Sequence, residues 1–177
     1  MPQLELVSPF SGSAEAIRAA RGVTETRCQA AGSDEERVLH RRIRHEVFVV
    51  EQRLFAVSDH DEHDEQHETV HGLGLCGSMV AGTVRFYPLA EPGVWKGDRL
   101  AVLPQFRRCG LGGPLVRFAV RTAGMRGGDQ MIAFIQRPNV PFFEHLGWRR
   151  AGSPVQYVGQ PHQKMVIDLT AGGPGDS

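Results

Sequence analysis

The stretch LAVLPQFRRCGLGGPLVRFAV, residues 100–120, decides the fold of this chain. The apolar run Leu100–Leu103 predicts a buried strand, and the amphipathic pattern of residues 111–125 predicts a helix. Between them lies a turn rich in glycine and arginine, Arg107–Gly113. The first N–H groups of a helix lack internal partners and lie at the positive end of its dipole. We therefore expect an anion to bind at this turn.

The residues of the turn suit a phosphate in particular. Gly110, Gly112 and Gly113 let a ligand approach the backbone closely. Arg107 and Arg108 add charged donors that match phosphate oxygens. The glycine spacing is neither that of a P-loop nor that of a dinucleotide-binding fingerprint. On these residues alone, a turn that merely caps the helix remains the alternative.

The turn resembles the coenzyme A pyrophosphate loop of the GCN5-related N-acetyltransferases (GNAT), written R/Q-x-x-G-x-G/A, which Arg107, Gly110 and Gly112 match. The preceding strand resembles the fourth strand of that family. The resemblance implies that the backbone of Ala101 and Val102 lies beside the pantetheine and thioester, where N–H donors would stabilise an oxyanion. It also implies that the coenzyme contacts the whole loop: Arg107, Arg108, Cys109, Gly110, Leu111, Gly112 and Gly113.

Other segments extend this resemblance over most of the chain. Arg44–Gln52, RHEVFVVEQ, is similar to a segment of ElaA-like acetyltransferases and autoinducer synthases. Gln136–Trp148 resembles the end of strand five and helix four of the GNAT family. Gly93–Val102, Asn139–Phe143 and Gly159–His162 look like the bacterial nitrogen-starvation N-acetyltransferases. The implied fold is α/β, with a mixed, mostly antiparallel central sheet flanked by helices.

Hydrophobic periodicity places the elements of this fold along the chain. Ser33, followed three residues later by Glu36, predicts the start of a helix. We expect helices at 34–52, 111–125 and 139–146, and strands at 23–28, 70–76, 80–87, 99–103, 131–136, 148–150 and 164–169. A single acetyltransferase domain over residues 22–170 would lie between a flexible N-terminal arm, 1–21, and a flexible tail, 171–177.

Composition agrees with one globular enzyme domain of 177 residues. No apolar stretch is long enough to span a bilayer and the N-terminus has no apolar signal region, so we expect a cytoplasmic protein without a membrane partner. The net charge is zero, but residues 59–68 hold six of the twenty acids. The modest basic excess of the remainder favours a polyphosphate ligand over nucleic acid. A homodimer is compatible with the sequence.

The three cysteines, Cys28, Cys76 and Cys109, follow no disulfide or zinc pattern. We expect reduced thiols. Cys109 lies inside the phosphate loop without a neighbouring His-Asp pair, and so we interpret it as structural rather than nucleophilic.

The GNAT resemblance implies transfer of an acetyl group from acetyl-CoA to a small primary amine, by direct attack in a ternary complex. An alkyl amine has a pKa of about 10.4 and must lose a proton before it attacks. Glu51 is the first candidate base because the segment that contains it lies near the acceptor cleft in similar proteins. Asp98 is the second candidate and His71 the third.

The leaving thiolate benefits from a proton. The tyrosine that many GNAT proteins carry in helix four is replaced here by Phe143, which cannot donate one. Tyr157 or His162 could supply the acid instead. Gln136 is expected to bond the pantetheine amides, and Asn139 either contacts the coenzyme or caps the short helix that follows it.

The histidines and acids of residues 59–71 leave two interpretations open. His60, His63, His67 and His71 could bind a divalent metal if the segment were helical. A solvated loop beside the substrate, whose acids attract a cationic amine, is the interpretation we favour, and we expect no metal cofactor. A non-catalytic acyl-CoA sensor and an acyl-homoserine-lactone synthase remain the alternatives to an acetyltransferase.

Overall fold

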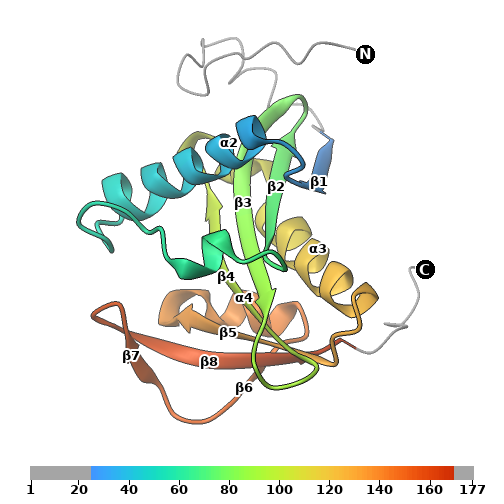
Figure 1. Cartoon of the computed structure of the whole chain (residues 1–177). Coiled ribbons are helices and arrows are strands. Elements are labelled where there is room, and N and C mark those ends of the chain that lie inside the picture. Colours follow the sequence, from blue (N-terminus) through green and yellow to red (C-terminus); the bar gives the residue numbers. More distant parts are fainter. Residues whose placement is uncertain (1–24, 170–177) are drawn as a thin grey trace.

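A computed structural model describes residues 25–169, so the predicted arm 1–21 and tail 171–177 lie outside the described residues. Its centre is an open, mostly antiparallel sheet of eight strands (Figure 1). The strand order is β1, β2, β3, β4, β5, β8, β6, and β7 pairs with β8. The strands are β1 (Thr26–Ala30), β2 (Val70–Cys76), β3 (Met79–Pro88), β4 (Val94–Val102), β5 (Gln130–Gln136), β6 (Arg149–Arg150), β7 (Val155–Tyr157) and β8 (Gln160–Asp168).

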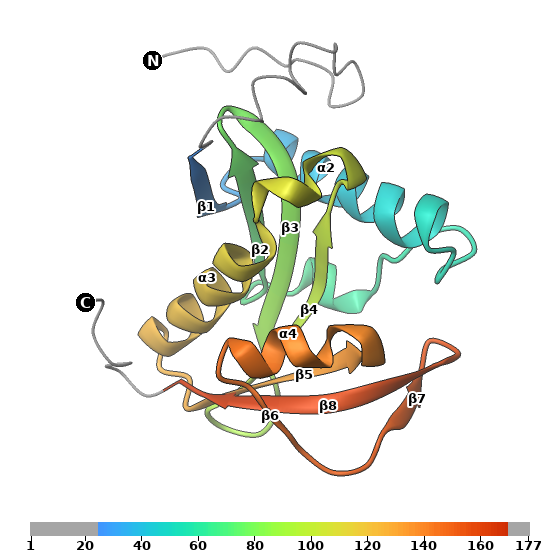
Figure 2. The same ribbon diagram turned by 180° about the vertical axis from the view of Figure 1, so that it is seen from behind.

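Helices cover both faces of the sheet. On one face lies α2 (Asp34–Arg44), which continues into the π-helical turn η1 (His45–Glu51). On the opposite face lie α3 (Gly112–Met125) and α4 (Val140–His145), as Figure 2 shows from behind. Three short 3-10 turns are η2 (Glu62–Glu65), η3 (Pro104–Cys109) and η4 (Arg137–Asn139). The arrangement confirms the expected α/β fold with a mixed sheet flanked by helices.

Most element boundaries follow the sequence prediction, and the exceptions have local causes. The hydroxyl of Ser33 caps α2 by accepting the Glu36 N–H at 3.1 Å, while the Glu36 carboxylate accepts the Gly32 N–H at 2.6 Å. Two strands begin earlier than predicted, β4 at Val94 and β8 at Gln160. In β4 burial alternates along the strand, but glycine and charged residues obscured this pattern in the sequence. The first residues of β8 and the three residues of β7, which was not predicted, are polar or exposed and carry no apolar alternation.

The strands β4 and β5, the one parallel pair within residues 25–169, diverge after a short ladder. Pairing joins Val94–Lys96 to Gln130–Ile132, after which β4 and β5 continue without pairing to each other. On its other edge β4 carries a bulge, because Arg99 and Leu100 together lie opposite Val84. Arg99 has a φ of 53°, a strained value for a residue with a side chain. The bulge bends β4 away from β5 and separates the two strands.

A buried histidine supports the sheet opposite this bulge. His40 of α2 is completely buried, and its Nε2 lies 3.1 Å from the carbonyl oxygen of Val84, which it contacts as a donor. Its Nδ1 has no hydrogen-bond partner among residues 25–169. Burial, followed by the nearby positive charge of Arg44, lowers the pKa of His40 to about 3. The imidazole is therefore neutral in the folded protein at neutral pH.

The buried histidine predicts a loss of stability in mild acid. Its pKa is about 3 when folded and about 6.5 when unfolded, so the unfolded chain binds the proton more tightly between these values. The stability that neutral His40 contributes is complete above pH 6.5 and is lost as the pH falls. The free energy of unfolding then decreases by at most about 1.4 kcal/mol per pH unit. Urea unfolding of the protein and of a His40→Gln variant between pH 7 and 4.5 measures it. The variant should be less stable at pH 7 and show a flatter pH dependence; equal slopes would contradict the prediction.

Candidate active site

The glycine-rich turn forms an exposed rim of backbone at the start of α3. The turn η3 ends at Cys109, and Gly110 follows it with a φ of 77°, a left-handed conformation that glycine adopts without strain. The side chain of Leu111 is buried and anchors the turn in the core. The helix α3 then begins at Gly112, and no side chain caps its first N–H groups. The turn therefore has the free donors and the open approach that an anion site requires.

One cavity adjoins this turn, and a second cavity lies next to the first. We call the first the loop cavity; it is lined by Val47, Gln52, Leu100, Ala101, Val102, Arg107, Gly110, Gly112, Gly113, Pro114, Arg117, Asn139, Phe142, His145 and Leu146. We call the second the gap cavity, because it lies where β4 and β5 diverge and takes walls from both strands. Gln52, Leu100 and Asn139 line both cavities, which therefore lie side by side.

The gap cavity has walls on both faces of the sheet. On the α2 face its walls include Phe48, Phe55, Asp98, Tyr157 and His162. On the face covered by α3 and α4 its walls are Val116, Ala119, Met131, Ala133, Phe143 and Trp148. The side chains of this second wall are aliphatic or aromatic, and the indole N–H of Trp148 is buried without an acceptor among residues 25–169.

The predicted base and the predicted phosphate-binding arginine are paired with each other. The carboxylate of Glu51, at the end of η1, accepts a hydrogen bond from a terminal nitrogen of Arg107. Both side chains are partly exposed at the mouth of the loop cavity. Gln52 lines both cavities, whereas Glu51 is not among the described lining residues of either. An anion that binds Arg107 would compete with Glu51 for it.

Gln136 and Asn139 both reach the junction of the cavities. The Gln136 amide nitrogen lies 3.4 Å from the side-chain oxygen of Gln52, across the gap from η1. Asn139 is the residue before α4, but its side chain makes no capping hydrogen bond. The capping alternative is therefore wrong, because η4 turns the chain into α4 with Asn139 already in a helical conformation.

Tyr157 and His162 form a polar corner of the gap cavity. Tyr157 stacks on Phe134 with ring centroids 5.7 Å apart, and the ammonium of Lys96 lies 5.3 Å from the Tyr157 ring centroid. His162 is buried, its ring centroid lies 5.2 Å from that of Tyr157, and its Nδ1 lies 2.9 Å from the carbonyl oxygen of Gln160. This contact is satisfied when Nδ1 carries the proton and leaves Nε2 as an acceptor.

Asp98 lines the gap cavity, but its carboxylate already accepts several hydrogen bonds. Arg85 donates to its two oxygens at 2.8 Å each, and the hydroxyl of Tyr87 donates at 3.3 Å. His71 lies away from both cavities, with its Nδ1 4.0 Å from a carboxylate oxygen of Asp64. Burial lowers the pKa of His71. The geometry thus leaves these two residues less free to accept a substrate proton than Glu51.

The acidic run, residues 59–68, is solvated only in part: Glu62, Glu65 and Glu68 are exposed, but the three aspartates are bound to the protein, which contradicts the expectation that all these acids are solvated. Asp59 and Asp64 are buried, and both pair with the completely buried Arg44, at 2.6 and 2.5 Å. Asp61 pairs with Arg85 at 2.6 Å. Although burial alone would raise it, the hydrogen bond from Arg44 holds the pKa of Asp64 below its usual range. These carboxylates are occupied by arginine and do not attract a cationic substrate.

The sequence could not reveal this network because its arginines come from elements far apart in the chain. Arg44 belongs to α2, Arg85 to β3 and Arg99 to β4, where Arg99 pairs with Asp59 at 2.9 Å. Two histidines of the segment also contact protein groups. His63 stacks on Tyr87 with ring centroids 4.1 Å apart, and His60 pairs with Glu65 at 2.9 Å. Within residues 25–169 no group of three or more His, Cys, Asp or Glu side chains is placed to hold a metal ion.

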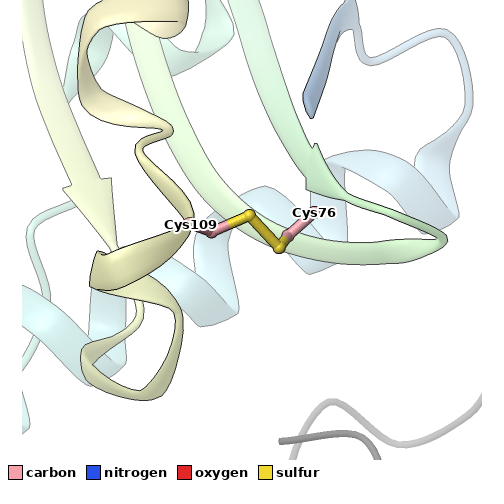
Figure 3. Close-up of a disulfide and its surroundings, with 2 residues drawn as sticks. All are labelled: Cys76 and Cys109. Carbon is pink, nitrogen blue, oxygen red and sulfur yellow. A yellow bond between two sulfur atoms is a disulfide. The ribbon is translucent and has the colours of Figure 1, made fainter. Parts of the chain in front are cut away.

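A disulfide joins Cys76 to Cys109, so the expectation that all three cysteines are reduced is wrong (Figure 3). Cys76 ends β2 and Cys109 ends η3, and their Cα atoms lie 6.4 Å apart. The two cysteines are 33 residues apart, and no sequence pattern indicates that they pair, because only the folded sheet brings these two segments together. Cys28 remains a free, partly buried thiol whose pKa burial raises. The bond excludes Cys109 as a nucleophile and anchors the glycine-rich turn to the sheet.

Comparison with known proteins identifies the family. A family model described as an acetyltransferase (GNAT) domain matches residues 44–150, and the chain therefore belongs to the GNAT acetyltransferases. It is 30% identical over 128 residues to the uncharacterized N-acetyltransferase YjcF of Bacillus subtilis (strain 168), covering 71% of this chain and 88% of that protein. As a member of this family, the protein is an acyltransferase. None of the helices in residues 25–169 is long and apolar enough to cross a membrane.

Solved structures share the fold at lower identity. Escherichia coli ElaA matches with a TM-score of 0.70 at 20% identity, over 81% of this chain and 98% of that chain. The CoA-dependent acyl-homoserine lactone synthase BjaI, solved with SAM and isopentyl-CoA, matches with a TM-score of 0.66 at 21% identity, over 82% of this chain and 83% of that chain. The fold is thus common to acetyltransferases and to acyl-homoserine lactone synthases.

The disulfide predicts a redox-dependent stability. In the chain-entropy view, a bridge that closes a loop of 33 residues stabilises the folded state by about 3 to 4 kcal/mol. Reduction, or replacement of both Cys76 and Cys109 by serine, should lower the free energy of unfolding by about this amount. Urea unfolding with and without dithiothreitol measures the loss. The double variant should no longer respond to the reductant, whereas a Cys28→Ser control should respond like the unmodified protein.

Proposed function

We propose that this protein transfers an acetyl group from acetyl-CoA to a small primary amine, by direct attack of the amine on the thioester in a ternary complex. The observation that carries the proposal is that the two cavities share lining residues. The turn lines the loop cavity, and the loop cavity has Gln52, Leu100 and Asn139 in common with the gap cavity, where β4 and β5 diverge. A phosphate-bearing thioester and a second substrate can therefore meet at Leu100, Gln52 and Asn139.

The coenzyme lies along the loop cavity in this proposal. Its pyrophosphate binds the free N–H groups at the start of α3 together with Arg107 and Arg108. The glycines allow this approach: a side chain at Gly112 would meet Phe142 at 3.4 Å and fill the groove between α3 and α4. The pantetheine then passes Ala101 and Val102, with Gln136 and Asn139 as its polar contacts. Backbone N–H groups beside the bulge of β4 stabilise the oxyanion.

Glu51 is the proposed base, and the coenzyme controls its availability. In the free protein the Glu51 carboxylate is paired with Arg107. When pyrophosphate takes that arginine, the carboxylate is released beside Gln52 and can accept the proton of the attacking amine. Asp98 is proposed to position the site through Arg85 rather than to move a proton, because its oxygens are already bonded.

Tyr157 is the proposed acid, in place of the tyrosine that Phe143 replaces. Phe143 is buried against Trp148, with ring centroids 5.4 Å apart, and forms part of the apolar wall. The Tyr157 hydroxyl, by contrast, makes no hydrogen bond to any residue of the described range. A thiol has a pKa of about 8.5 and is a fair leaving group, so the acid should matter less than the base.

Release of free CoA thiol tests the proposed function directly. The full chain is incubated with acetyl-CoA and a panel of small primary amines, and the thiol is titrated with a chromogenic disulfide. Amine-dependent thiol release together with an N-acetylated product by mass spectrometry is the expected result. Tight binding of acetyl-CoA without turnover of any amine would instead indicate a sensor.

Removal of the Arg107 side chain should weaken coenzyme binding. The Arg107→Ala variant loses charge-assisted hydrogen bonds to pyrophosphate, which corresponds to about 1.5–3 kcal/mol of binding free energy. Calorimetric titration with CoA measures the change. Arg126→Ala removes an exposed arginine at the far end of α3, remote from the lining of both cavities, and should bind like the unmodified protein. If the Arg107 variant and this control bind CoA with equal affinity, the hypothesis that the turn binds the coenzyme is refuted.

Glu51→Gln should separate the binding role of the ion pair from the chemical step. We expect turnover to fall at least tenfold, equivalent to about 1.4 kcal/mol of barrier. CoA affinity should be unchanged or higher, because the arginine no longer has a competing carboxylate. Tyr157→Phe should cost less turnover. If Glu51→Gln keeps nearly normal turnover and Tyr157→Phe is nearly inactive, the prediction is wrong. The proton transfers would then be assigned to Tyr157 and its neighbour His162.

A further inference from the structure

The gap cavity extends further than an acetyl group requires. A thioester held beside Ala101 projects its acyl group towards the gap, where Leu100 and Gln52 lead from one cavity into the other. Beyond this junction the cavity is lined by Val116, Ala119 and Met131. Val116 and Ala119 belong to α3, which covers one face of the sheet (Figure 2). Two carbon atoms would end near the junction and leave this extension unused.

The amine acceptor does not suit this extension. Its walls are aliphatic or aromatic side chains, and none of them carries a carboxylate. An ammonium group would find no countercharge there, and burying its charge unpaired is costly. The polar corner at Asp98, Tyr157 and His162, on the other face, is the part of the cavity that suits a polar amine.

Small residues form the passage to the extension. The strand β4 carries Gly97 where it separates from β5, and β5 carries Ala133. The missing side chain of Gly97 would point at Met131, whose sulfur lies 3.2 Å from the position of a β-carbon. On α3, Ala119 rather than a larger residue faces the cavity. Larger side chains at these positions would close the passage.

We infer that the apolar extension of the gap cavity holds the acyl chain of a CoA thioester longer than acetyl, with the chain lying between β4 and β5 and ending against Ala119 and Trp148. This inference rests on the proposed function and adds the class of acyl donor. The reaction is unchanged: the amine nitrogen forms a bond to the thioester carbon, the carbon–sulfur bond breaks, and the thiolate leaves with the proton that the acid supplies. A longer acyl chain then increases the affinity for the CoA thioester, because more methylene groups are buried.

Calorimetry without an amine tests the inference independently of the acceptor. Dissociation constants of the full chain are measured for CoA, acetyl-CoA, butyryl-CoA and hexanoyl-CoA. Each buried methylene contributes a factor of up to roughly four in affinity, so hexanoyl-CoA should bind at least about tenfold more tightly than acetyl-CoA. Equal or weaker binding of hexanoyl-CoA, with acetyl-CoA still bound, overturns the inference and leaves the proposed function intact. Failure of CoA itself to bind overturns the proposed function.

Matched glycine variants test where the acyl chain lies. Gly97→Ala adds one methyl group at the passage, against the flexible side chain of Met131. Gly74→Ala is the control in a buried strand that does not line the cavity; its β-carbon would meet Leu115 at 3.1 Å and Leu111, the anchor of the glycine-rich turn, at 3.2 Å. Gly97→Ala should reduce the advantage of hexanoyl-CoA and spare acetyl-CoA, whereas Gly74→Ala should leave the ratio of the two affinities unchanged, because any effect on the turn is the same for every thioester. A loss shared equally by all thioesters in Gly97→Ala would contradict the assignment.

A second, larger substitution strengthens the test. Ala119→Leu fills the end of the extension from α3, and it should bring the affinity for hexanoyl-CoA down to that for acetyl-CoA. Thermal melting establishes whether this overpacked variant folds. If it does not, Gly97→Ala decides the question, since its single methyl group meets only a flexible side chain. An Ala119→Leu variant that folds and keeps the full hexanoyl preference would refute the inference.

Discussion

A buried network of arginines and aspartates holds the two halves of the site together. Arg44, Arg85 and Arg99 project from α2, β3 and β4, and the segment before β2 supplies Asp59, Asp61 and Asp64 between them. Such a network depends on complete pairing, because removing one partner of a buried ion pair leaves an uncompensated charge and costs about 3–5 kcal/mol. The segment is therefore held against the sheet, and η1 and the bulged part of β4 are positioned relative to each other.

The bulge in β4 connects this network to the proposed chemistry. Arg99, with its strained φ of 53°, is both a member of the network and one of the two bulge residues. Its neighbour Leu100 lines both cavities. Ion pairing on the α2 face thus stabilises a backbone distortion that separates β4 from β5 and opens the gap. Strain of this kind persists only where surrounding contacts determine the conformation.

The disulfide holds the glycine-rich turn in place, as the ion pairs hold the bulge of β4. Glycine makes a turn open to a ligand but raises the entropy lost when the turn is ordered. Cys109 lies within that turn, and its bond to Cys76 fixes the turn to the end of β2. The buried Leu111 adds a second anchor on the following residues. The loop is thereby ordered before any ligand binds, which lowers the conformational cost of binding.

Local patterns were sufficient for the elements and for the loop. The apolar run before Arg107, the glycines after it and the amphipathic helix beyond them depend only on neighbours in the chain, so the turn and the helix were predicted close to their observed positions and the strand was predicted near its C-terminal end. The GNAT family, confirmed by the match over residues 44–150, rests on these local motifs as well.

Contacts between distant segments were decided by the tertiary structure alone. The acidic run reads as a solvated loop until Arg44, Arg85 and Arg99 are brought around it, because burial of a carboxylate depends on partners that the local sequence does not contain. The pairing of Cys76 with Cys109 and of Glu51 with Arg107 likewise joins residues from different elements. The apolar extension of the gap cavity exists only because two strands diverge, and strand divergence is a property of the folded sheet and not of either strand.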